Sequence, residues 1–205
     1  AFRQQHGFAH DDLLILQVGS GFVIKGVDRS LRAIAALPEH LRSKVTYLLV
    51  GQDKPGRFLR LARQLGIADR CRFLGGRSDV PEFLFGCDLL LHPAYSESAG
   101  YTLLEATVAG LPVLTTDTCG YAFHVERAQS GQVSPSPFRQ EDLDVRLRTM
   151  LEALPTSTWS ANGITYGRTA ELYDMPQAVM DLVEVLVSRG RSGKPSAAIH
   201  KEATA

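Results

Sequence analysis

Apolar and polar residues follow two different periods along this chain. Short apolar runs predict buried parallel strands, whereas apolar residues spaced three and four apart predict helices. The predicted strands are Leu13–Val18, Val45–Val50, Arg72–Leu74, Asp88–His92, Val113–Thr116 and Gly131–Val133. The predicted helices are Val27–Leu37, Arg57–Leu65, Val80–Phe85, Tyr101–Ala109, Ala122–Ala128, Asp142–Leu154, Thr158–Tyr166 and Gln177–Ser188.

Strands and helices thus alternate, and the connections between them are short. This predicts an α/β fold, a Rossmann-like parallel sheet with helices on both faces. We expect one domain over residues 1–188 and a disordered tail over 189–205, where apolar periodicity is absent. Ligands of such sheets bind at the carboxyl ends of the strands. The loops expected to form a site are Gly19–Gly26, Gly51–Gly56, Gly75–Val80, His92–Tyr101 and Thr116–Tyr121.

Composition argues against several classes of protein. The 205 residues suffice for one well-buried domain, and 22 basic and 22 acidic residues balance, so nothing favours a nucleic-acid partner. No apolar run is long enough to span a membrane. Three scattered cysteines predict reduced thiols and hence a cytoplasmic protein. Residues Ala1–Asp12 have no signal-peptide pattern and do not begin with Met, so we expect a piece of a longer protein.

The segment after the fourth strand holds the most informative pattern. Glu97 and Glu105 stand eight residues apart across the small-residue turn Ser98-Ala99-Gly100. Glu97 is expected in the loop and Glu105 early in the next helix, whose free N–H groups point into the same crevice. Such a crevice suits an anion flanked by hydroxyl groups, as in a nucleotide sugar. Each acid alone also has a plain explanation, as a solvated loop acid or a helix-start acid favoured by the dipole.

The first loop offers a second candidate. Gly19 and Gly21 allow a close approach of the backbone to phosphate, and Lys25 can supply a positive charge to a diphosphate. A plain turn with a surface lysine is an equally good interpretation. The loop is neither a dinucleotide fingerprint, since its third glycine is Gly26, nor a P-loop.

Two further patterns are weaker. Asp142-Leu143-Asp144 has the form of a metal–nucleotide motif, but it falls in the first turn of a predicted helix, where acids favour the helix dipole. We therefore expect no metal. His92 ends a buried strand, where a histidine is usually structural, yet it lies beside the Glu97 loop.

Taken together, these motifs point to a family. Glu97-x7-Glu105, preceded by His-Pro-Ala-Tyr and followed by Ala-Gly-Leu-Pro-Val, resembles the donor-site signature of the retaining GT-B glycosyltransferases of family 4. The resemblance covers Phe2 to Ser188. Further segments look like the lipopolysaccharide core glucosyltransferase I subgroup, namely Lys25–Ser30, Val50–Pro55, Leu91–Tyr95 and Cys119–Ala122.

The resemblance implies the carboxyl-terminal, donor-binding half of a GT-B fold, with the amino-terminal acceptor domain absent from this chain. It implies a UDP-sugar as donor, a hexose as the transferred group, the lipopolysaccharide inner core as acceptor, and no metal cofactor. The chain alone would be inactive. The full-length protein would be cytoplasmic and peripheral at the inner membrane.

The resemblance also implies a role for each matching residue. Lys25 would stabilise the departing UDP, Glu97 would hold a hydroxyl of the donor sugar, and Glu105 would accept hydrogen bonds from the ribose. Backbone groups around Arg77 and Val80 would read the uracil. The other substrate-binding positions implied are Gly21, His92, Ser98, Ala99, Gly100, Tyr101, Thr102 and Leu104.

One position departs from the family. Five residues before the lysine, where the family usually has Arg, this chain has Ser20. Either Arg77 or the absent half compensates, or the protein is a weak or inactive nucleotide-binding relative with a regulatory role. A dinucleotide-dependent oxidoreductase is a third hypothesis, disfavoured because Gly51-Gln52 stands where a ribose-binding acid would end the second strand.

Overall fold

The computed structural model describes residues 2–172 and 179–185. Residues 1–169 form one compact unit and residues 170–205 a second, and each is described by itself. Residues 179–185 are helical, within the helix predicted at Gln177–Ser188. The rest of that helix and the predicted tail lie outside the described residues, so the predicted domain end at 188 stays a prediction.

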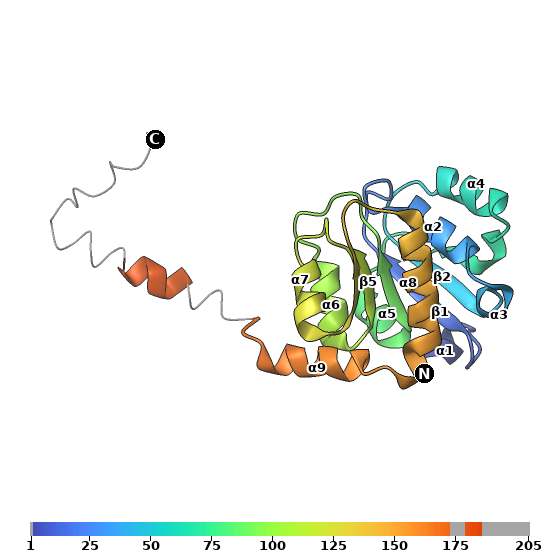
Figure 1. The fold of residues 1–205 in the computed structure, drawn as a ribbon. Coiled ribbons are helices and arrows are strands. Elements are labelled where there is room, and N and C mark those ends of the chain that lie inside the picture. The colour runs from blue at the N-terminus through green and yellow to red at the C-terminus, as the bar shows by residue number, and fades with distance from the viewer. Residues whose placement is uncertain (1, 173–178, 186–205) are drawn as a thin grey trace. The chain divides into compact units, whose positions relative to one another are not determined.

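The larger unit is built on a six-stranded parallel sheet with the order β3-β2-β1-β4-β5-β6. Figure 1 labels β1, β2 and β5 of this sheet. The strands are β1 Leu13–Val18, β2 Val45–Val50, β3 Cys71–Phe73, β4 Leu89–His92, β5 Val113–Thr116 and β6 Gly131–Ser134. β1, β2 and β5 begin and end where the apolar runs predict, β4 and β6 differ by one residue at one end, and β3 is shifted by one residue at both ends. The predicted α/β class is confirmed.

Helices connect the strands. They are α1 Phe2–Gln5, α2 Val27–Ala35, α3 Glu39–Arg42, α4 Gly56–Gln64, α5 Val80–Gly86, α6 Tyr101–Ala109, α7 Ala122–Ala128, α8 Gln140–Ala153 and α9 Trp159–Thr169, with 3-10 turns at Ala68–Arg70 and Leu154–Thr156. The predicted bounds of α6 and α7 are correct. Helices α1 and α3 were not predicted from the sequence, because four residues are too few to show a helical period. None of the helices within the described residues has the length and apolar character needed to cross a bilayer.

Both faces of the sheet are covered, because successive side chains of a strand point to opposite faces. Ile15, Tyr47 and Leu49 pack with residues of α2, α4 and α8. Leu14 and Leu48, which alternate with them, pack with residues of α5, α6 and α7. Each fully buried leucine contributes roughly 1.5–3 kcal/mol.

The strand order creates one special position. From β1 the chain moves outward to β2 and β3, then returns to the other side of β1 as β4. Helix α2, after β1, packs on one face of the sheet, and α6, after β4, packs on the other. The loops after β1 and β4 therefore lead to helices on opposite faces of the sheet. This place is the topological switch point, and the region outside the carboxyl ends of these strands, where such sheets bind ligands, is called the crevice below.

Candidate active site at the switch point

The loop after β1 is a compact turn. The Lys25 amide donates to Gly21 O at 2.9 Å, and Gly21 and Gly26 have φ of 78° and 70°, which glycine adopts without strain. A side-chain carbon at Gly26 would collide with the carbonyl oxygen of Pro93, in the loop after β4. Glycine at this position thus lets the two loops touch.

The loop after β4 is held from the other side by a buried arginine. Arg29, on α2, donates to the carbonyl oxygens of Pro93 and Ala94 at 3.2 and 3.1 Å. Its guanidinium lies 3.6 Å from the ring centroids of both Tyr95 and Phe138, a cation–π arrangement. Arg29 was not among the residues predicted from the sequence, because its partners are distant in sequence and no local pattern identifies it.

Lys25 and Glu97 meet across the crevice. The Lys25 ammonium forms an ion pair with the Glu97 carboxylate, and their side chains are only 20% and 13% exposed. Burial lowers the pKa of the Lys25 ammonium, and the nearby Cys119 opposes this by raising it. The structure thus brings together the two residues assigned a catalytic role by resemblance, although they are far apart in sequence.

His92 lies beneath this pair. It is the last residue of β4 and is 1% exposed, with its Nε2 3.6 Å from a Glu97 oxygen. Burial, helped by the charge of Lys25, lowers the pKa of His92 to about 4, so the ring is neutral at neutral pH. A separation of 3.6 Å is too long for a hydrogen bond, and neither ring nitrogen has a partner within the described residues. Such a buried, unpaired imidazole can still bind a polar group that enters the crevice.

The start of α6 completes the crevice. Gly100, at the N-cap, has a φ of 88°, and the first amides of an α-helix have no partner within the helix. The preceding turn is fixed to the loop after β5, since Gly120 N donates to Glu97 O at 3.0 Å and Tyr121 N to Ala99 O at 2.7 Å. Ser98 is exposed, and Thr102 and Leu104 are half-buried on the helix that follows.

Glu105 lies one turn after Tyr101, on the exposed side of α6. No hydrogen bond or ion pair joins its side chain to the Lys25–Glu97 pair within the described residues. The Tyr101 ring is 65% exposed and packs edge-on against Tyr121, with ring centroids 5.3 Å apart. Glu105 is therefore free to face a ligand.

Arg77 and Val80 follow β3, at the edge of the sheet and two strands away from β1. The Arg77 guanidinium donates two hydrogen bonds to Asp79, at 2.7 and 2.5 Å. To compensate for the charge missing at Ser20, Arg77 would have to leave Asp79. The hydroxyl of Ser20 accepts a hydrogen bond from the backbone amide of Gln52 at 3.1 Å.

The Asp-x-Asp motif is part of a helix, as predicted. Asp142 lies in the first turn of α8, and Asp144 accepts a hydrogen bond from Gln140 at 2.7 Å. Within the part of the chain that the structure describes, no group of three or more His, Cys, Asp or Glu residues is arranged to hold a metal ion.

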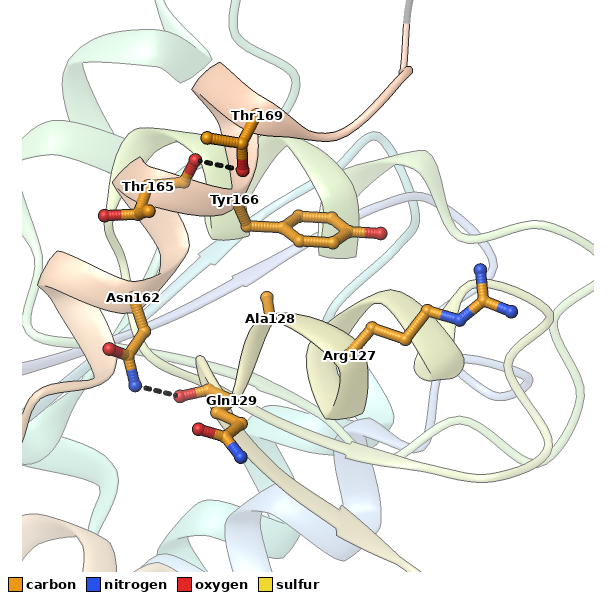
Figure 2. A pocket seen from close by; sticks show the side chains of 7 residues that line it. All are labelled: Arg127, Ala128, Gln129, Asn162, Thr165, Tyr166 and Thr169. Atoms are coloured by element: carbon orange, nitrogen blue, oxygen red, sulfur yellow. Dashed lines mark hydrogen bonds between the residues drawn. The ribbon is translucent and has the colours of Figure 1, made fainter.

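A hollow of about 260 Å³ lies elsewhere, between α7 and α9 (Figure 2). Figure 2 shows the Asn162 amide reaching the backbone oxygen of Gln129, a hydrogen bond of 3.0 Å. The residues that line this hollow are Arg127, Ala128, Gln129, Asn162, Thr165, Tyr166 and Thr169. It contains none of the predicted site residues, and the candidate site remains the crevice at the switch point.

Comparison with known proteins gives consistent relatives. The family described as "Glycosyl transferases group 1" matches residues 1–158. Lipopolysaccharide glucosyltransferase WaaG of Escherichia coli (strain K12) is 48% identical over 183 residues, which are 89% of this chain and 49% of that protein. A D-inositol 3-phosphate glycosyltransferase of Streptomyces scabiei is 35% identical over 143 residues, 64% of this chain and 32% of that protein.

Comparison with solved structures also identifies WaaG as a relative. A crystal structure of WaaG has a TM-score of 0.85 and 48% identity, covering 89% of this chain and 50% of that one. Anabaena Alr3699/HepE in complex with UDP-glucose has a TM-score of 0.73 and 26% identity, covering 91% of this chain and 51% of that one. The chain thus spans about half the length, or less, of the curated relatives it matches.

Proposed function

Because this chain belongs to the group 1 glycosyl transferases, we propose that it is the donor-binding half of a retaining hexosyltransferase. The donor is a UDP-sugar and the acceptor is the inner core of lipopolysaccharide. The observation that carries the proposal is the Lys25–Glu97 pair at the switch point. The likeness to WaaG supports the acceptor, and the likeness to a protein crystallised with UDP-glucose supports the donor.

The chemistry follows from charge. The bond between the anomeric carbon and the diphosphate oxygen breaks, the acceptor hydroxyl bonds to that carbon, and its proton passes to the departing UDP. Negative charge grows on the diphosphate, and Lys25 stabilises it more in the transition state than in the ground state. Glu97 accepts a hydrogen bond from a sugar hydroxyl and so keeps the reacting carbon in place.

In the unliganded chain, Lys25 and Glu97 neutralise each other. The donor replaces each partner with one of its own groups, the diphosphate for Lys25 and a hydroxyl for Glu97. His92 lies close enough to offer a neutral hydrogen-bonding group to the same hydroxyl. Glu105 accepts from the ribose, the backbone near Arg77 and Val80 contacts the uracil, and the α6 start binds phosphate or sugar oxygens.

The acceptor would bind mainly to the other half of the protein, peripheral at the inner membrane. A second hypothesis is a weak or inactive relative that binds nucleotide and has a regulatory role. Ser20 favours this second hypothesis, because a serine hydrogen-bonded to Gln52 supplies no charge to the diphosphate.

Calorimetric titration of the chain with UDP tests the donor site. UDP should bind, with an affinity unchanged by EDTA, and Lys25→Ala should weaken it about tenfold or more, the loss of roughly one charged hydrogen bond. Lys54→Ala is the matched control, since Lys54 is an exposed lysine of the neighbouring loop. Equal effects of the two substitutions would remove Lys25 from the site, and NAD binding without UDP binding would favour the oxidoreductase hypothesis.

A chimera separates the two hypotheses. Replacing the matching half of E. coli WaaG with this chain should give an enzyme that transfers hexose. A folded chimera that binds UDP but transfers nothing would favour the inactive relative.

A further inference from the structure

Gln17 is a buried amide in an apolar strand. It is the penultimate residue of β1 and is 0% exposed, and the residues before it, Ile15 and Leu16, are aliphatic and equally buried. A buried amide costs free energy unless its polar atoms are paired. The contacts that Gln17 makes therefore need an explanation.

Three hydrogen bonds pair the polar atoms of this amide. Its Nε2 donates to the carbonyl oxygen of Lys25 at 2.7 Å, while its Oε1 accepts from Ser30 at 2.7 Å and from Tyr47 at 2.6 Å. Burial raises the pKa of the Tyr47 hydroxyl well above its usual value, so this group stays protonated and donates. One side chain thus links β1, β2 and α2 to the loop that carries Lys25.

The bond to Lys25 reaches the backbone of the residue that pairs with Glu97. The Lys25 amide donates to Gly21 within the same loop, whereas the Lys25 carbonyl is held from the sheet below by Gln17. The lysine ammonium stands on a flexible four-carbon stem, so its position depends on where its backbone is fixed. A change at Gln17 would therefore move the ammonium relative to any ligand in the crevice.

A purely structural role for Gln17 makes a different prediction. Its oxygen accepts hydrogen bonds from the buried hydroxyls of Ser30 and Tyr47, and those bonds contribute to packing between α2 and β2. Its nitrogen donates to the backbone carbonyl oxygen of Lys25. Because the oxygen and the nitrogen of the amide have different partners, the two halves of the amide can be tested separately.

We infer that Gln17 is a positioning residue, which holds the Lys25 backbone where the lysine ammonium meets the donor diphosphate. Gln17 touches no ligand and acts through Lys25. The inference rests on the proposed function, because it requires a diphosphate at Lys25.

The test compares UDP with uridine, which lacks the phosphates. In the whole chain, Gln17→Leu should weaken UDP about five- to tenfold and leave uridine within about twofold, since only the phosphates depend on Lys25. In a Lys25→Ala background, Gln17→Leu should weaken UDP no further, because residues that act through one another are not additive. If Gln17→Leu does not fold, Gln17→Glu replaces it, since a glutamate keeps the oxygen acceptors and lacks the amide donor.

Tyr47→Phe and Ser30→Ala are the matched controls. Each removes a partner of the Gln17 oxygen and leaves the bond to Lys25, so each should change the melting temperature but not UDP affinity. If Gln17→Leu weakens UDP and uridine equally, or still weakens UDP without Lys25, Gln17 is structural only. If Lys25→Ala itself leaves UDP affinity unchanged, the diphosphate site fails, and the inference about Gln17 fails with it.

Discussion

Two ion pairs lie at the same edge of the sheet and differ in how they are made. Lys25–Glu97 joins the loops after β1 and β4, and its side chains are 20% and 13% exposed. Arg77–Asp79 closes within the loop after β3, between residues two apart in sequence, with exposures of 32% and 30%. The first pair needs the whole sheet to form, and the second needs only a turn.

The difference indicates which pair serves a ligand. An exposed local pair contributes roughly 0–1 kcal/mol and shapes its own loop. The pair at the switch point lies in the crevice, with the neutral His92 below it and the start of α6 beside it. Its two charged groups come from separate loops, so a ligand can pair with each of them separately.

The largest expected effect is on turnover. In the WaaG chimera, Lys25→Ala and Glu97→Ala should each lower kcat by about 10²-fold or more, the scale of one preorganised electrostatic partner. Arg77→Ala is the control from the local pair and should leave kcat within a few-fold. Steady-state transfer rates decide this, and near-normal turnover of Glu97→Ala would contradict its assigned role.

The second effect is a pH dependence confined to the crevice. The folded pKa of His92 is about 4, below its ordinary value of 6.5, so the unfolded chain binds the extra proton between these pH values. The free energy of unfolding therefore keeps its full value above about pH 6.5 and falls as the pH drops to 4, by on the order of 3 kcal/mol for this group. Urea unfolding across this range should show a smaller loss for His92→Gln than for the wild type, and no such change for the exposed His10→Gln.

A third effect separates the two glutamates. Glu105→Ala should weaken UDP about tenfold, since a carboxylate that accepts from ribose hydroxyls contributes roughly 1.5–3 kcal/mol. Calorimetry measures this directly. An unchanged dissociation constant would remove Glu105 from the nucleotide site.

Glu97→Gln should act in the opposite direction. It breaks the pair, frees Lys25 and removes a negative charge from the crevice, so UDP should bind about threefold more tightly. Asp79→Asn breaks the local pair in the same way and releases Arg77, and tighter UDP binding by this variant would mean that Arg77 can compensate for Ser20. Weaker UDP binding by Glu97→Gln would mean that Glu97 contacts the nucleotide and not the sugar.

The smallest effect is expected at the local pair itself. Arg77→Ala should change the free energy of unfolding by no more than about 0.5 kcal/mol, as is usual for exposed side chains. A larger loss in thermal unfolding would mean that Arg77 also depends on its place over Phe83, 5.1 Å from the ring centroid.

The fold and the catalytic candidates were predictable from local patterns. Buried parallel strands are continuous apolar runs, and the repeated unit with short connections leaves few topologies. Lys25 and Glu97 were candidates because a turn with two glycines and a small-residue turn follow predicted strands at these places, and the family resemblance supplied their catalytic roles. The outer strands and α8 shifted by one or two residues, since element ends depend on contacts that periodicity does not contain.

What the sequence alone determined was the α/β class and the edge of the sheet at which a ligand should bind, because both follow from periodicity and chain direction. What only the tertiary structure decided was which polar groups meet there. Gln17 and Arg29 are single polar residues within otherwise ordinary elements, and their partners come from other strands and loops. Lys25 meets Glu97 because the order of strands brings the loops after β1 and β4 together, whereas Arg77 and Asp79 need only the turn that they share.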